Sequence, residues 1–175
     1  MKLLNTLTEY GIFSKVFHWL SAAVLIIQIP LGMYLVDMDF SEKRLTIENI
    51  HVAVGISIFY LTILRLIYKT FNPTPNLNNN IFPGQKIIAR LNHVFLYISI
   101  LIITISGALK KLYNGEELNM FFFNLEIQDN FELAEIFYEI HILGNYTLIA
   151  LISLHISAVI IHKLLFKENL LKRIL

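Results

Sequence analysis

Long stretches without a charged residue dominate the hydrophobic pattern of this 175-residue chain. An apolar helix of about 20 residues crosses the hydrocarbon core of a bilayer. The pattern therefore predicts an all-α integral membrane four-helix bundle, formed by a single domain over residues 1–175, with spans at approximately 14–36, 45–69, 85–111 and 131–166. The uncharged stretches behind these spans are Val16–Val36, Asn49–Leu64 (which extends through Arg65 to Tyr68), Leu91–Leu109 and Ile140–His162.

Composition supports a membrane protein and limits its chemistry. The chain is 56% hydrophobic with a mean hydropathy of +0.63, well above a soluble domain. It contains no cysteine, which excludes disulfides, thiolate ligands and the C-x-x-C-H signature of covalent haem attachment. No small-residue cleavage site follows a short apolar core at the N-terminus, so we expect the first span to be retained. The sequence shows no extended basic aromatic surface, so we do not expect nucleic acid as a partner.

Charge is distributed unequally between the two ends of the predicted bundle. Ten lysines and arginines, against only two acids, flank the spans on the side that carries both termini and the loop after span two. On the opposite side, four basic residues face eleven acids. Basic residues prefer the cytoplasmic side of a membrane. We therefore expect both termini to be cytoplasmic, in a multi-pass protein of the bacterial inner membrane.

Three of the six histidines lie in the last uncharged stretch. His155 follows His141 by fourteen residues, and His162 follows His155 by seven. At about 100° per residue these spacings place the three imidazoles on one helix face at three depths. Imidazole ligates metals and haem iron, and polar side chains within a span usually face the bundle interior. Simple hydrogen bonding to neighbouring helices is the alternative, but three histidines in register favour ligation.

The depths of the histidines pair them across helices. His51 and His141 lie near the outer ends of their spans, whereas His18 and His155 lie in the inner half. The sequence therefore predicts one haem held by His51 and His141, and a second held by His18 and His155, about 20 Å apart along the membrane normal. Both are expected to be non-covalent haem b.

Two further histidines, His93 and His162, lie close to the inner interface. Either remains an alternative ligand in place of His18 or His155. We assign both to hydrogen bonding or proton handling in a pocket for ubiquinone or another quinone.

Glycines and one arginine fit the same scheme. Arg65 follows His51 by fourteen residues and is expected to pair with a haem propionate, although snorkelling to the inner surface is an alternative. Glycine permits close approach of a macrocycle, although small residues also serve helix packing. The glycines at the outer haem's expected depth are Gly32, Gly55, Gly107 and Gly144.

The connections carry weaker signals. Pro30-Leu31-Gly32 predicts a kink in the first span, and residues 72–84 form a turn-rich loop. The run Met120–Phe123 is expected at the membrane surface or over the end of the bundle. Asp129 or Asn130 suits the N-cap of the last span.

These residues together resemble the bacterial cytochrome b561 family, which are di-haem four-helix membrane cytochromes related to the cytochrome subunits of nickel hydrogenases. The resemblance spans nearly the whole chain and implies that His18, His51, His141 and His155 ligate the haems. The stretches that carry it are Phe17-His18-Trp19, Asn49–Ile56, Leu64-Arg65-Leu66, Asn72–Pro75, Asn92-His93, Ile140-His141 with Gly144, Leu154-His155 through His162, and Phe166–Asn169.

Two functions are consistent with this resemblance. The first is an electron carrier between a periplasmic donor and the quinone pool, and it extends to family members that oxidise superoxide and reduce ubiquinone. Acidic outer loops depart from the basic funnel that an anionic substrate favours. The second is a haem-bearing membrane anchor that docks a periplasmic redox protein and has no substrate of its own. A four-helix membrane protein without a cofactor is a third alternative.

Overall fold

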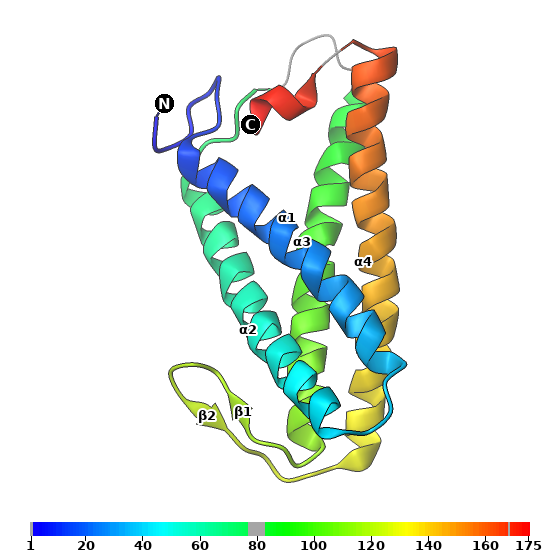
Figure 1. Cartoon of the computed structure of the whole chain (residues 1–175). Coiled ribbons are helices and arrows are strands. Elements are labelled where there is room, and N and C mark those ends of the chain that lie inside the picture. Colours follow the sequence, from blue (N-terminus) through cyan, green and yellow to red (C-terminus); the bar gives the residue numbers. More distant parts are fainter. Residues whose placement is uncertain (1, 77–82, 168) are drawn as a thin grey trace.

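The computed structural model describes residues 2–76, 83–167 and 169–175. Over these residues, four long helices account for most of the structure, and each is long and apolar enough to cross a membrane (Figure 1). This confirms the all-α four-helix membrane bundle. The elements are α1 (Ile12–Val36), α2 (Glu42–Phe71), α3 (Pro83–Tyr113), β1 (Leu118–Asn119), β2 (Asn124–Leu125), α4 (Phe131–Leu165) and the 3-10 helix η1 (Leu170–Arg173).

α1, α2 and α3 extend two or three residues beyond the predicted spans at one end or both, and α4 begins at the predicted residue. Ser41 caps α2 by accepting a hydrogen bond from the backbone N–H of Arg44 at 3.2 Å. Asn130 caps α4 through Leu133 at 3.1 Å, as one of the two predicted cap residues. Such caps satisfy backbone donors that a helix start leaves without partners. The helices thus begin in the water-facing regions.

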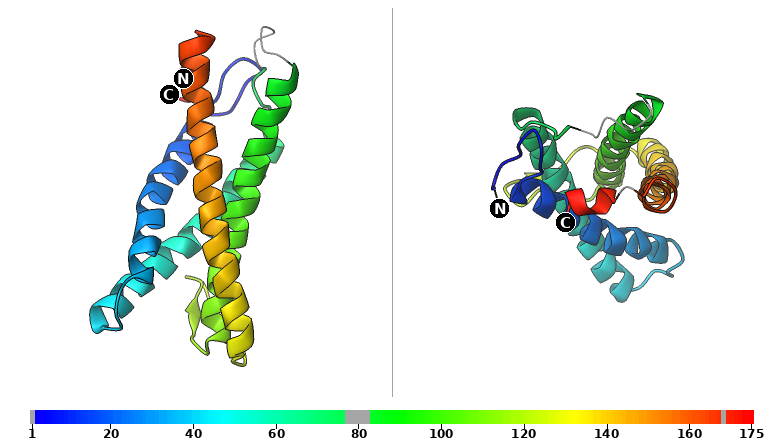
Figure 2. Two further views of the ribbon diagram at one scale, coloured as in Figure 1. Left: turned by 90° about the vertical axis from the view of Figure 1, so that its right-hand side faces the viewer. Right: turned by 90° about the horizontal axis from the view of Figure 1, so that it is seen from above.

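The four helices form two pairs that diverge. α3 and α4 run side by side along their length, and α1 packs on α2, which in turn packs on α3 (Figures 1 and 2). α1 continues as one helix through Pro30. A cavity lies inside the bundle and is lined by residues of all four helices.

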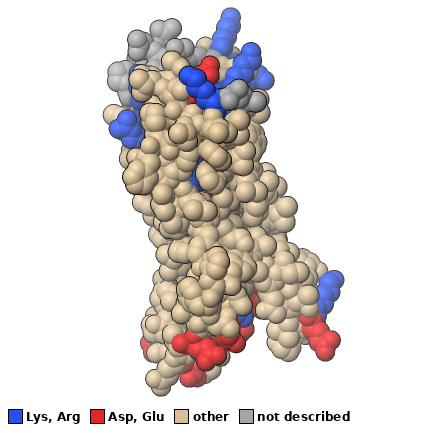
Figure 3. Space-filling model, turned by 90° about the vertical axis from the view of Figure 1, so that its left-hand side faces the viewer, with Lys and Arg blue, Asp and Glu red and all other residues tan. Residues whose placement is uncertain are grey.

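The surface reflects the expected environment. Large apolar side chains point outward along the middle of the helices; Ile26 is 72% exposed and Leu143 is 69% exposed. Lys and Arg gather at the end that carries both termini, and Asp and Glu gather at the opposite end (Figure 3). An apolar belt between two polar ends is the surface that a bilayer requires.

The run Met120–Phe123 forms the tip of a short hairpin between β1 and β2, which pair in antiparallel register. α3 ends before it in a Schellman motif: the N–H of Gly115 bonds the carbonyl of Leu112 at 3.0 Å, and that of Glu116 bonds Lys111 at 3.3 Å. Gly115 has φ +78°, which a glycine adopts without strain. In the turn-rich loop, residues 77–82 lie outside the described residues, as does Glu168.

Candidate functional site

His51 of α2 and His141 of α4 face each other in the half of the bundle opposite the two termini, the half predicted to be outer. Their ring centroids are 6.2 Å apart. His141 Nδ1 lies 2.8 Å from the carbonyl oxygen of Ile103 on α3. Since a carbonyl only accepts, Nδ1 carries the proton and Nε2 keeps its lone pair. His51 Nδ1 is buried without a hydrogen-bond partner in the described part of the chain.

A cavity of about 310 Å³ surrounds this pair and is lined by residues of all four helices. Gly32 and Gly107 line it where a side chain would collide with an imidazole. A Cβ at Gly32 would come within 2.8 Å of His51 Cε1, and one at Gly107 within 2.9 Å of His141. The absence of a side chain at these two glycines therefore leaves the space that the imidazole rings occupy.

The other two predicted glycines have different neighbours. Gly55 also lines the cavity, and a Cβ added there would lie 3.7 Å from Gln28 Nε2, which is ordinary contact. A Cβ at Gly144 would meet Ile103 Cγ1 at 2.8 Å, so Gly144 serves the close packing of α3 against α4.

Gln28 belongs to the same site and is absent from the sequence prediction. Its side chain is buried, and Nε2 donates to the carbonyl of His51 at 2.8 Å. Its amide oxygen is buried without a hydrogen-bond partner in the described structure. The sequence does carry a signal for Gln28, because a single amide side chain in an uncharged span usually faces the bundle interior.

A second histidine group lies toward the other end of the bundle. The ring centroids of His18 on α1 and His155 on α4 are 6.3 Å apart, and those of His93 on α3 and His155 are 5.0 Å apart. His93 Nδ1 donates to the carbonyl of Ala89 at 2.6 Å. His162 lies two helical turns beyond His155, with its ring 5.2 Å from Phe166. The structure thus brings His18, His93 and His155 together.

Arg65 joins this group from α2. Its Nη2 lies 3.0 Å from His18 Nδ1, and its guanidinium carbon lies 5.3 Å from the ring centroid of Tyr97. Lys69 Nζ lies over the same ring at 4.9 Å. A guanidinium only donates, so His18 Nδ1 is the acceptor here and its Nε2 carries the proton.

Both facing pairs have the separation that a shared iron requires. An imidazole nitrogen binds a transition metal at about 2 Å and lies about 1 Å from its ring centre, so rings on opposite sides of one ion have centroids about 6 Å apart. The observed distances are 6.2 and 6.3 Å. The described residues hold no group of three or more His, Cys, Asp or Glu suited to a metal ion. Two histidines suit a metal whose other ligands come from a macrocycle.

Residues 9–175 match the family model described as prokaryotic cytochrome b561. The chain belongs to the prokaryotic cytochrome b561 family. It is therefore a multi-pass membrane protein of an electron-transfer family, and cytochrome b561 membership implies haem b.

Two proteins of Escherichia coli K12 are similar to this cytochrome b561 family member. Cytochrome b561 homolog 2 is 26% identical over 179 residues, covering 100% of this chain and 95% of the relative. Cytochrome b561 homolog 1 is 27% identical over 137 residues, covering 77% of this chain and 78% of the relative. The similarity to the first relative extends over all four helices.

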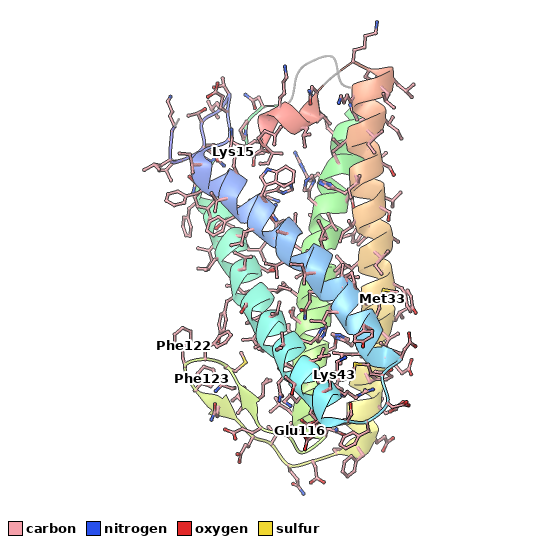
Figure 4. The ribbon with its side chains drawn as sticks, viewed as in Figure 1. Lys15, Met33, Lys43, Glu116, Phe122 and Phe123 are labelled. Carbon is pink, nitrogen blue, oxygen red and sulfur yellow. The ribbon has the colours of Figure 1, made fainter. Side chains whose placement is uncertain are left out.

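Three basic residues line the mouth of the cavity, and each has a hydrogen-bond or ion-pair partner in the described structure. Lys110 pairs with Glu48 at 3.2 Å, and Arg44 donates to the carbonyl of Met38. Lys111 pairs with Glu116. Burial acts to raise the pKa of Glu116, but the hydrogen bond and charge of Lys111 outweigh it and hold the pKa below its usual value. The charges of the two lysines are therefore compensated, whereas Arg44 bonds a neutral carbonyl and Lys43 lies exposed at the start of α2 (Figure 4).

Proposed function

We propose that this protein binds two haem b groups non-covalently and moves electrons between the periplasmic side of the bacterial inner membrane and the quinone pool. The observation that carries the proposal is the pair of facing histidine couples, His51 with His141 and His18 with His155, at 6.2 and 6.3 Å. Haem iron supplies reversible one-electron chemistry between its ferrous and ferric states. Two such centres at different depths give electrons a route across the membrane.

The surrounding residues prepare the histidines for ligation. The bond from His141 Nδ1 to Ile103 fixes the ring and its tautomer, leaving Nε2 for iron. At the inner pair, ligation through His18 Nε2 requires the proton on Nδ1. A protonated Nδ1 could no longer accept the hydrogen bond from Arg65. The guanidinium would then be available to a haem propionate.

The quinone is proposed to bind at the end that carries the termini, beside the inner pair. The excess of Lys and Arg at that end supports a cytoplasmic orientation of both termini (Figure 3). Quinone reduction consumes protons, and histidine titrates near neutral pH. His93 and His162 are the proposed proton-handling groups, with Arg65 and Lys69 nearby.

The electron donor on the outer side distinguishes two versions of this function. In one, superoxide gives its electron to the outer haem, and the protein is a superoxide:ubiquinone oxidoreductase. In the other, the protein is an anchor and electron-transfer subunit for a periplasmic redox protein. The ion pairs of Lys110 with Glu48 and of Lys111 with Glu116 favour the second version, because they leave neither lysine uncompensated to attract an anion.

Haem quantitation and a reduced-minus-oxidised spectrum of the purified protein test the site. We expect two haem b per chain, both low-spin, and complete extraction into acid-acetone because the chain has no cysteine. His141→Ala should remove the outer haem and keep the inner one, while His155→Ala should do the reverse. One haem per chain in the unmodified protein, or loss of both haems from a folded single variant, would contradict the proposal.

A further inference from the structure

The segment from Gly115 to Ile127, here called the aromatic hairpin, presents three phenylalanines at its tip. Phe122 is 85% exposed, and Phe121 and Phe123 are each 53% exposed. The tip lies between the paired residues Leu118 with Leu125 and Asn119 with Asn124. Clustered exposed apolar side chains mark an interaction surface in a folded protein.

The hairpin is firmly attached to the bundle and runs along α2. Leu118 is only 1% exposed and packs in a cluster with Ile56 of α2 and Leu112 of α3. Met120 packs against the same cluster. The exposed tip is therefore held in place by buried residues at its base.

Contacts with Tyr60 of α2 hold the tip at a defined position along that helix. Its hydroxyl donates to the carbonyl of Met120 at 3.1 Å, and its ring lies 6.4 Å from Phe121 and 6.0 Å from Phe122. Tyr60 follows Glu48 by twelve residues, which is about 18 Å along the helix. The tip therefore lies beside the uncharged part of α2, and Figure 4 places Phe122 and Phe123 farther along that helix than Glu116.

Four polar backbone groups at the tip have partners within the protein. The N–H of Met120 donates to the carbonyl of Phe123 at 2.9 Å, and the N–H of Phe121 donates to Asn119 Oδ1 at 2.7 Å. The carbonyl of Met120 accepts from Tyr60. Such pairing lowers the cost of placing irregular backbone next to an apolar medium, where unsatisfied polar groups are unfavourable.

Charge changes sharply along the hairpin. Residues 118–125 contain no charged side chain, whereas Glu116, Glu117 and Glu126 lie together at the base. A base that requires water and a tip that avoids it match the two sides of a membrane interface.

We propose that the aromatic hairpin inserts its tip among the lipids of the leaflet on its side of the membrane, next to α2. Lipid acyl chains are the partner, and the contact is additional to the four spans. The insertion fixes the depth of the connection between α3 and α4. It is independent of haem binding and of the proposed electron transfer.

Single-cysteine labelling tests this insertion, because the chain has no cysteine of its own. Phe122→Cys is introduced and the protein is placed in lipid nanodiscs that hold one chain each. The rate of modification by a charged maleimide is then measured. Glu117→Cys at the hairpin base is the water-exposed control, and Ile26→Cys in the middle of α1 is the lipid-facing control. Phe122 is almost fully exposed, so its replacement disturbs little packing.

We expect the thiol of the Phe122→Cys variant to react at least about tenfold more slowly than that of Glu117→Cys, since a desolvated thiol remains protonated. Its protection should resemble that of Ile26→Cys and disappear in denaturing detergent. Equal reaction rates for the Phe122→Cys and Glu117→Cys variants in nanodiscs would overturn the proposal. So would protection that appears only in native membranes, because a second copy or another protein would then cover the tip.

Discussion

At the scale of single residues, Gly32 and Gly107 leave no room for a side chain beside the two imidazoles that are proposed as haem ligands. Gly107 is the sharper case, because an added Cβ would lie 2.9 Å from both Cε1 and Nδ1 of His141. The ring is also held at Nδ1 by its bond to the carbonyl of Ile103. His141 therefore has no simple way to move aside.

Gly107→Ala should consequently weaken binding of the outer haem. Overpacking a well-filled site costs about 1–3 kcal/mol, which corresponds to roughly a 5-fold to 150-fold loss of affinity. Haem titration of the variant, followed by the spectrum of the outer component, measures this loss. Gly84→Ala is the matched control, since nothing lies within 4 Å of its added Cβ. Full outer-haem occupancy in Gly107→Ala with unchanged affinity would contradict the assignment of the cavity.

The sequence predicts which histidines meet, because helical periodicity and depth along four spans are enough to pair them. It does not predict their other neighbours. The bond from Arg65 to His18 and the 5.0 Å separation of His93 from His155 depend on how each helix is rotated and tilted. Helical spacing places Gly32 on the face of His18, yet it lies against His51 because α1 crosses α2 at that level.

At the scale of elements, the spans predicted from the sequence end within three residues of the ends of the four helices. The sequence does not predict that residues 115–127 form a hairpin, because the two strands have only two residues each and carry no alternating pattern. Its position depends on contacts with Tyr60 and Ile56, which are about sixty residues away in sequence. The sequence indicates that the aromatic run lies near the membrane, whereas its position beside α2 is determined by tertiary contacts.

The ion pair between Lys111 and Glu116 ties the end of α3 to the hairpin. Because the folded protein holds the pKa of Glu116 below its usual value, the pair stabilises the fold at pH values above about 4.5. That stabilisation is lost as the pH falls through the lowered pKa. The Glu116 side chain is 42% exposed, so solvent screening keeps the contribution small.

Glu116→Gln should therefore lower the free energy of unfolding by less than about 1 kcal/mol at pH 7, with the difference disappearing at strongly acidic pH. Thermal unfolding of both proteins in detergent across a pH series measures this. Glu117→Gln is the control, because Glu117 lies next in sequence but has no ion-pair partner among the described residues. If the difference in stability between the two proteins grew as the pH was lowered, the ion pair would not be the source of the stabilisation.

At the scale of the whole molecule, charge is separated along the bundle axis. The end that carries the hairpin has eleven acids and four basic residues, and three of those basic residues have partners at the cavity mouth. The resulting negative potential repels anions and attracts cations over roughly a Debye length, which is about 10 Å at 0.1 M salt. The charge of the donor therefore determines how salt affects its encounter with the outer face.

This potential predicts opposite salt dependences for the two proposed donors. Superoxide is an anion, so the second-order rate constant for haem reduction by superoxide should rise as salt screens the repulsion. A small basic redox protein is attracted, so its rate constant should fall with salt. Stopped-flow reduction of the oxidised protein at several ionic strengths measures both, with an uncharged quinol as the control that salt leaves nearly unchanged. A superoxide rate constant that is fast at low salt and falls as salt is added would indicate a local basic entry path that outweighs the acidic face, and would favour the superoxide oxidoreductase over the anchor.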